Sequence, residues 1–384
     1  MLDYKRQNNF DAVRLFLAMT VVLGHLTWML PGNYGPLQIA LNHFDGAKAV
    51  DCFFVISGFL IFRSFRRSKS HADYWSNRIR RIYPALVAVI VATVIWGAFV
   101  TTTSPKEYFS SPTLGYLIYN LLFMSFRQNS LPGVFENSQI HFLNGALWTL
   151  KIEAMFYISV PLIVFFARKF LRFEILAVIL YLLSVIFKMT LHHMAVTKQL
   201  PVYDNWGSQL PGQLSFFMAG GLLEYCSETF RRHASVYLGL AVLGLAVSNW
   251  LGAYALYPIS LAIVVIYVCD VLPYLGNISR YGDFSYGLYV SHFPIILSFA
   301  ALSLLPGNPI LRAVIALLAC LIYAVLSWHL IEKRWLRPRN RLSPVTLRPR
   351  LAGNEPHPLP AAASYPMATW QQPLAPNADR SLVP

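Results

Sequence analysis

Long apolar runs separated by short polar segments dominate the sequence. A membrane-spanning helix needs about 20 mostly apolar residues. Ten runs reach or approach that length, namely 10–30, 47–65, 82–101, 147–167, 173–191, 211–227, 234–252, 254–272, 285–305 and 309–331. The pattern predicts an all-α polytopic membrane protein with about ten transmembrane helices.

Basic residues alternate with these runs and indicate the orientation of the helices. They cluster before residue 10, at 63–81, at 168–172, at 231–232 and after 333, whereas 31–46, 102–146 and 192–210 hold few of them. Cytoplasmic loops carry an excess of Lys and Arg, so ten spans with both termini in the cytoplasm satisfy this distribution. An eleventh apolar run, 113–126, would break the alternation. We therefore expect it to be interfacial, re-entrant or packed on the outer side.

Composition narrows the class of partner. Charged residues make up 12% of the chain, against roughly 25% in soluble domains. The net charge of +14 lies in loops and tail, which favours lipid headgroups over nucleic acid. We find no phosphate-binding glycine loop and no metal-binding Cys/His spacing, and the four cysteines fall in apolar runs, so we expect no metal and no disulfide framework. Residues 1–340 are expected to form one membrane domain, and the Pro-rich 341–384 a disordered cytoplasmic tail.

The first apolar run carries two polar residues that are costly in hydrocarbon. Arg14 and His25 are eleven residues apart, close to three helical turns, so they share one face about 16 Å apart along the axis. Ionisable residues within spanning helices usually mark functional sites. The spacing predicts one wall of a polar site, with a structural histidine as the alternative for His25.

Two carboxylates are expected near the outer end of the bundle with His25. Asp51 and Glu153 both enter from outside in the predicted topology. A carboxylate bonded to an imidazole fixes its tautomer and stabilises the imidazolium. The alternatives are a helix-start residue for Asp51 and a structural ion pair for Glu153. Ser57 and Gly58 would let a helix or a ligand approach closely.

A second polar group is expected at the cytoplasmic end. Arg78, Arg81 and Pro84 stand three residues apart where the third run begins, and arginine forks bind phosphate bidentately. Tyr286 and His292 lie on a tyrosine-rich stretch of the ninth run, for which an interhelical hydrogen-bond cluster is the alternative reading. His329 and Glu332 close the last run and are expected at the membrane interface.

Taken together, five ordered blocks resemble the acyltransferase-3 family of integral membrane acyltransferases. The blocks are the Arg14–His25 spacing, VDCFFVISGF at 50–59, the Arg78–Arg81–Pro84 spacing, LWTLKIEAMFY at 147–157 and SYGLYVSHFP at 285–294. The similarity covers about residues 8–340. Ala154 stands where the family often has a second acidic residue, and IEKRW at 331–335 lacks a common proline.

The resemblance implies an O-acyltransferase that takes an acetyl or other short acyl group from cytoplasmic acetyl-CoA or another acyl-CoA. Arg14, Arg78 and Arg81 would hold the phosphates, with Tyr286 and His292 on the donor side. His25 would be the general base, oriented by Asp51 or Glu153. A general base of this kind typically raises the reaction rate by about 10²–10⁴-fold. The expected acceptor is an envelope glycan such as lipopolysaccharide O-antigen or exopolysaccharide, at a bacterial inner membrane.

Three alternatives compete with this interpretation, and one of them, a different membrane acyltransferase fold, would need its own spacing of His and Asn or Asp. A transporter or flippase of an envelope precursor would also place polar residues at both ends of a bundle. Transporters usually show inverted repeats and interrupted helices, and we find no matching pair. A purely structural membrane protein would use its buried polar residues only to hold helices together, which the five ordered blocks disfavour.

Overall fold

The protein is described by a computed structural model that covers residues 8–336. This part of the chain is helical and contains no strand, so the predicted all-α class is confirmed. Its main helices are α1 (Phe10–Met29), α3 (Gly46–Arg67), α4 (His71–Val100), α7 (Leu147–Lys169), α8 (Phe173–Lys198), α10 (Leu210–Tyr225), α12 (Ala234–Leu251), α13 (Tyr257–Ile266), α14 (Ser285–Ala301) and α15 (Pro309–Ser327). The predicted tail, 341–384, lies outside the described residues.

Each of the ten predicted runs overlaps one of these helices. Within residues 8–336, seven segments are long and apolar enough to cross a membrane: Phe10–Met29, His71–Val100, Leu147–Lys169, Phe173–Lys198, Ala234–Leu251, Tyr254–Val271 and Pro309–Trp335. The other three main helices are α3, α10 and α14. Of these, α10 and α14 are shorter than the seven segments, with 16 and 17 residues. The protein is a multi-pass membrane protein, and the number of spans and the side of the termini stay predictions.

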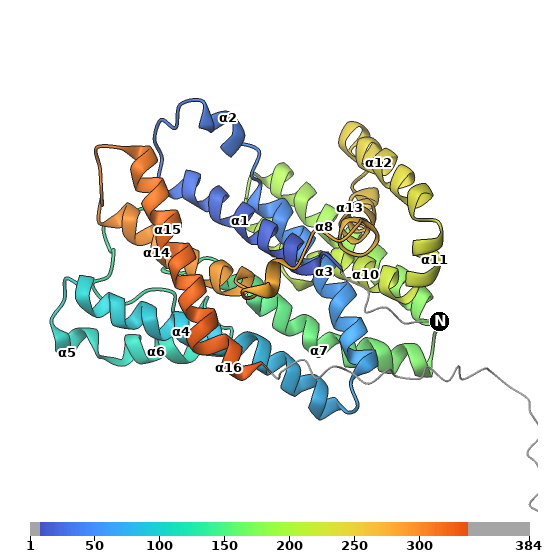
Figure 1. The fold of residues 1–384 in the computed structure, drawn as a ribbon, viewed down its shortest axis with the longest axis horizontal. Helices are drawn as coiled ribbons and strands as arrows, with labels where there is room; N and C mark the ends of the chain where they lie inside the picture. Colours follow the sequence, from blue (N-terminus) through green and yellow to red (C-terminus); the bar gives the residue numbers. More distant parts are fainter. Residues whose placement is uncertain (1–7, 337–384) are drawn as a thin grey trace, which may run out of the picture. The chain divides into compact units, whose positions relative to one another are not determined.

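Shorter helices connect or extend this set. They are α2 (Leu37–Leu41), α5 (Pro105–Tyr108), α6 (Ser111–Leu121), α9 (Val202–Gly207), α11 (Ser227–Arg232) and α16 (Lys333–Trp335), with short 3-10 or π-helical turns at Tyr254–Leu256, Tyr267–Val271, Ile278–Arg280 and Trp328–Glu332. The eleventh apolar run corresponds to α6, which packs beside α4 (Figure 1). Its 11 residues span about 16 Å, which is too short to cross a hydrocarbon core of about 30 Å.

The start of α7 is buried inside the bundle. Nδ2 of Asn144 donates a hydrogen bond to the carbonyl oxygen of Val290 in the middle of α14, at 2.9 Å. Thr149, near the first turn of α7, contacts the hydroxyl of Tyr289. These two contacts hold the start of α7 against α14.

The helices α3 and α10 touch at their backbones. A side chain added at Gly58 would collide with the carbonyl group of Phe217, and one added at Gly220 would collide with that of Val55. Small residues allow this close approach in membrane bundles. The predicted role of Gly58 in close helix packing is thus observed.

Candidate active site

A cavity of about 660 Å³ opens among α1, α3, α4, α7 and α14. Its polar lining includes Arg14, Arg78, Arg81, Glu153 and Tyr286, all of which the sequence singled out. We call this space the arginine cavity. Ser57 also faces it. The structure therefore brings Arg14 of α1 together with Arg78 and Arg81 of α4, and guanidinium groups of this kind bind anionic ligands.

Asp283 connects two of the arginines. Its Oδ2 lies 2.8 Å from Nη2 of Arg81 and 3.7 Å from Nη1 of Arg14, and Ser285 donates a hydrogen bond to its Oδ1. Burial opposes ionisation of this carboxyl group, but Arg81 and Arg14 outweigh that effect and hold the pKa of Asp283 well below its usual range. Sequence reasoning missed Asp283, although its place two residues before the Ser285–Tyr286 pair was an available signal.

The third arginine has unused hydrogen-bonding capacity. Nη2 of Arg78 donates to the hydroxyl of Ser64 at 3.0 Å, while its buried Nε has no hydrogen-bond partner among the described residues. The guanidinium carbon of Arg78 lies 5.4 Å from the ring centre of Tyr157. The buried Nε donor of Arg78 can therefore bond to a phosphate oxygen of a ligand.

Glu153 belongs to the arginine cavity and not to the group around His25. Its Oε1 accepts a hydrogen bond from the hydroxyl of Tyr157 at 2.6 Å. The expectation that it shares the outer end with His25 is wrong for a physical reason. The helix α7 starts inside the bundle. Glu153, six residues after that start, therefore lies near the arginines.

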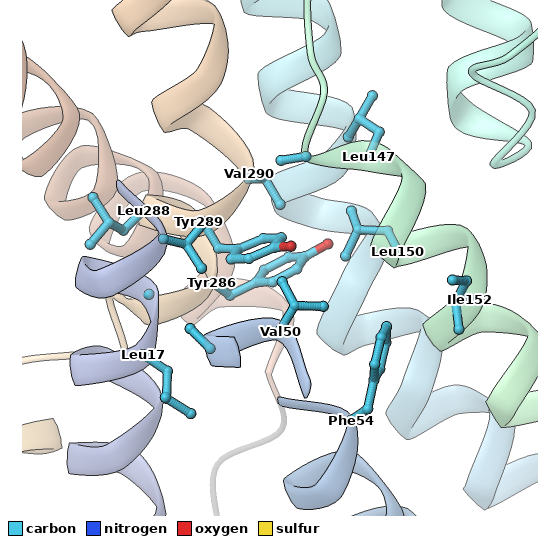
Figure 2. Packing of buried hydrophobic residues seen from close by; sticks show 14 of the residues in the cluster. Leu17, Val50, Phe54, Leu147, Leu150, Ile152, Tyr286, Leu288, Tyr289 and Val290 are labelled. Atoms are coloured by element: carbon cyan, nitrogen blue, oxygen red, sulfur yellow. The ribbon is translucent and has the colours of Figure 1, made fainter. Parts of the chain in front are cut away.

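Two tyrosines of α14 line the part of the arginine cavity that is nearest to His292. Tyr286 and Tyr289 point side by side from α14 toward α7 (Figure 2). The hydroxyl of Tyr286 donates to the carbonyl oxygen of Ile82, and that of Tyr289 bonds to the hydroxyl of Thr149 at 2.7 Å. Tyr289 is one helical turn from His292, about 4.5 Å along the axis.

His292 and His25 contact each other directly. Nε2 of His292 lies 3.3 Å from Nδ1 of His25. Nδ1 of His25 also bonds to the carbonyl oxygen of Val21, and Nδ1 of His292 to that of Tyr289. A carbonyl oxygen only accepts, so each Nδ1 carries the proton and each Nε2 has the lone pair. Nε2 of His25 is thereby left as a proton acceptor, with no hydrogen-bond partner in the described part of the chain.

On its other side His25 faces a second space, a hollow of about 500 Å³ between the end of α1 and residues 41–47. Trp28, Asn42 and Asp45 line it with His25. We call it the outer hollow, after the side that the charge bias predicts. The arginine cavity and the outer hollow share no lining residue among those described.

Two further expectations about site residues are corrected. Asp51 interacts electrostatically with Lys188 of α8, and no described ion pair or hydrogen bond joins Asp51 or Glu153 to His25. Asp51 points away because α3 turns this residue toward α8 and α13. Glu332 is 4% exposed and accepts a hydrogen bond from Ser327, so it is a buried residue and not an interfacial one.

Comparison with known families identifies the class of protein to which this chain belongs. The family model of acyltransferase family 3, described as an acyltransferase domain, matches residues 7–329. The chain belongs to this family. It is an acyltransferase, as the five sequence blocks implied, and the transporter and purely structural alternatives lose their support. The four cysteines, Cys52, Cys226, Cys269 and Cys320, are free in the structure.

Two of the three relatives described here are named as O-acetyltransferases. The O-acetyl transferase of Shigella phage Sf6 is 28% identical and covers 86% of this chain and 96% of its own length. Nodulation protein 10 of Rhizobium leguminosarum bv. viciae is 26% identical, covering 88% and 95%. The peptidoglycan O-acetyltransferase OatA of Listeria monocytogenes is 25% identical over 84% of this chain but only 55% of its own. These relatives support an O-acetyltransferase, and no solved structure matches the chain.

Proposed function

We propose that the protein transfers an acetyl or other short acyl group from cytoplasmic acyl-CoA to a hydroxyl of a cell-envelope glycan at a bacterial inner membrane. The observation that carries the proposal is that α1 serves two sites of opposite chemistry. Arg14 lies in a cavity suited to phosphates, and His25 presents a lone pair to a hollow at the other end of the helix.

The donor fits the arginine cavity. Coenzyme A carries several phosphates, and the cavity is lined by four guanidinium groups, those of Arg14, Arg78, Arg80 and Arg81. The pantetheine arm would extend past Tyr289 and Thr149 toward His292, and the side chains between the two spaces would move to let the thioester reach His25. Lipopolysaccharide O-antigen and exopolysaccharide are the leading acceptors. The names of the phage and peptidoglycan O-acetyltransferases support acetyl as the acyl group, and that of the peptidoglycan enzyme supports a glycan as the acceptor.

The proposed proton transfers follow from the tautomers of His25 and His292. Nε2 of His25 takes the proton of the acceptor hydroxyl, whose oxygen forms the new ester bond with the thioester carbonyl carbon. The C–S bond breaks, and the departing thiolate takes the proton from His25. His292 holds Nδ1 of His25 as a donor throughout, so Nε2 remains the basic atom.

The test compares wild type with His25→Ala in a host that lacks the gene. Ester-linked acyl groups on purified envelope glycans are measured by mass spectrometry at equal membrane abundance. We expect the acyl substituent to be lost in His25→Ala and kept in His193→Ala, which removes an exposed histidine of α8. Unchanged acylation in His25→Ala would refute the assigned base, and no acylated fraction with wild type would refute the enzyme's proposed acceptor class.

A further inference from the structure

The outer hollow contains an exposed aromatic ring beside the proposed base. Trp28 follows His25 by three residues, so both side chains leave α1 on the same face. Their ring centres are 6.1 Å apart in an edge arrangement, and Trp28 also contacts Phe293. Despite these two contacts, 58% of Trp28 is exposed. An indole held from one side and open on the other is a preformed stacking surface.

Polar groups face this surface across the hollow. Asn42 accepts a hydrogen bond from Gln38 through Oδ1, and its Nδ2 has no hydrogen-bond partner among the described residues. Asp45 caps α3 through Oδ1, while its Oδ2 lies 3.4 Å from Nζ of Lys48. One free amide donor and one carboxylate oxygen at the rim can therefore bond to hydroxyl groups.

The charge of the hollow separates it from the arginine cavity. No Arg or Lys is among the described residues that line it. The carboxylate of Asp45 is balanced by Lys48 and by the amino end of α3. Four guanidinium groups line the arginine cavity and none lines the outer hollow, so the hollow suits an uncharged polar ligand.

We propose that the outer hollow is the acceptor subsite and binds a neutral sugar ring, stacked on Trp28 and hydrogen-bonded by Asn42 and Asp45. This inference rests on the proposed function and adds to it the place and the chemical class of the acceptor. The electron-rich face of an indole attracts the C–H face of a sugar, and amide and carboxylate groups suit its hydroxyls. The volume of about 500 Å³ lies within the range of small-molecule sites, about 300–1,000 Å³. A ring stacked on Trp28 presents an edge hydroxyl to Nε2 of His25.

The packing around Gly24 supports a fixed shape for this subsite. A side chain at Gly24 would lie 3.1 Å from the carbonyl oxygen of Phe44 and 3.5 Å from the nitrogen of Gly46. The absence of a side chain lets residues 44–46 pack directly against α1. The back wall of the hollow is therefore backbone, which holds its form when a ligand binds.

The test uses the full-length protein in lipid nanodiscs. The acceptor is the envelope glycan that wild type acylates in cells, isolated and de-esterified with mild base, and the donor is radiolabelled acetyl-CoA. For Trp28→Ala we expect KM for the glycan to rise about tenfold, with KM for acetyl-CoA unchanged. Trp28→Phe keeps an aromatic face and should restore most of the affinity. Trp250→Ala, which removes an 87% exposed indole at the end of α12, should change neither constant.

Two outcomes would overturn the inference. An unchanged KM for the glycan in Trp28→Ala, with wild type active, would leave the proposed function standing and remove the subsite. Equal loss of folded protein in Trp28→Ala and Trp28→Phe, together with an unchanged KM for the glycan in Asn42→Ala, would make Trp28 a membrane-interface anchor. If wild type acylates no envelope fraction, the proposed function itself fails.

Discussion

His292 holds His25 through a direct contact between Nε2 and Nδ1 at 3.3 Å, and both Nδ1 atoms are committed to backbone carbonyl oxygens. The pair joins the two helices α1 and α14 at a level between the arginine cavity and the outer hollow. Because His292 has no exposed surface, we expect it to position His25 and not to contact the acceptor.

Replacing His292 tests this positioning role. His292→Ala removes an acceptor for Nδ1–H of His25, and kcat should fall about tenfold with both KM values unchanged. His292→Asn offers an amide oxygen in its place and should retain more activity than His292→Ala. Steady-state kinetics on protein of equal thermal stability give the answer. Equal losses in both variants that track a lower Tm would instead indicate a packing role.

Asp283 offers a second prediction, on stability and donor binding. Asp283→Asn leaves Arg14 and Arg81 without their partner, and breaking such a buried pair costs on the order of 3 kcal/mol. Phosphates of the donor can replace the lost carboxylate, so we expect a larger rise in Tm on adding coenzyme A to the variant than to wild type. Thermal unfolding in detergent measures both effects.

A matched control for Asp283 is Asp204→Asn, which breaks an exposed pair with His192. This change should alter stability by less than about 1 kcal/mol and leave the response to coenzyme A as in wild type. The depressed pKa of Asp283 gives a further check. Its stabilising contribution is present above the unfolded value of about 3.9 and is lost only as pH falls through the lower folded value. The Tm difference between wild type and variant should therefore stay constant from about pH 5 to 8.

Arg78 is predicted to contact a donor phosphate. Arg78→Lys keeps the charge but loses the planar fork, so KM for acetyl-CoA should rise about tenfold with little change in kcat. Comparing coenzyme A with dephospho-coenzyme A as competitive inhibitors then shows whether Arg78 contacts the 3′-phosphate. The exposed Arg232→Lys should leave all constants unchanged. A wild-type KM in Arg78→Lys would contradict the assignment of this arginine to the donor.

The contact between α3 and α10 predicts a contrast between two glycines. Gly58→Ala places a methyl group against the carbonyl group of Phe217, and such overpacking costs about 1–3 kcal/mol. Gly239→Ala, in the open middle of α12, meets nothing within 4 Å and should stabilise its helix by about 0.5–1 kcal/mol. Opposite signs of the Tm change are expected, and a stable Gly58→Ala protein would refute the close packing.

Local sequence predicted the helices well because apolar length alone determines them in a membrane protein. It placed α1, α3 and α14 near their observed ends, and α6 was correctly separated from the longer runs. The depth of a residue in the membrane was harder to predict than the helix that contains it. The start of α7 was assumed to mark the membrane surface, whereas Asn144 anchors it to Val290 inside the bundle. Glu153 was therefore assigned to the wrong group.

The contacts between helices were beyond sequence reasoning for a related reason. His25 and His292 are separated by 267 residues, and Asp283 reaches Arg14 across a similar distance in the chain. Periodicity shows which face of a helix is polar, but not which other helix meets that face. Asp51 illustrates this limit, because its face meets Lys188 of α8 and not His25.

The separation of the arginine cavity from the outer hollow also bears on the electrical cost of the reaction. In the proposed transfer, the phosphates of the donor stay with Arg14, Arg78 and Arg81, and only the uncharged pantetheine arm passes the histidine pair. Moving one elementary charge across the membrane would involve about 2.3 kcal/mol per 100 mV. Because no net charge crosses in the proposed transfer, the rate should be insensitive to membrane potential.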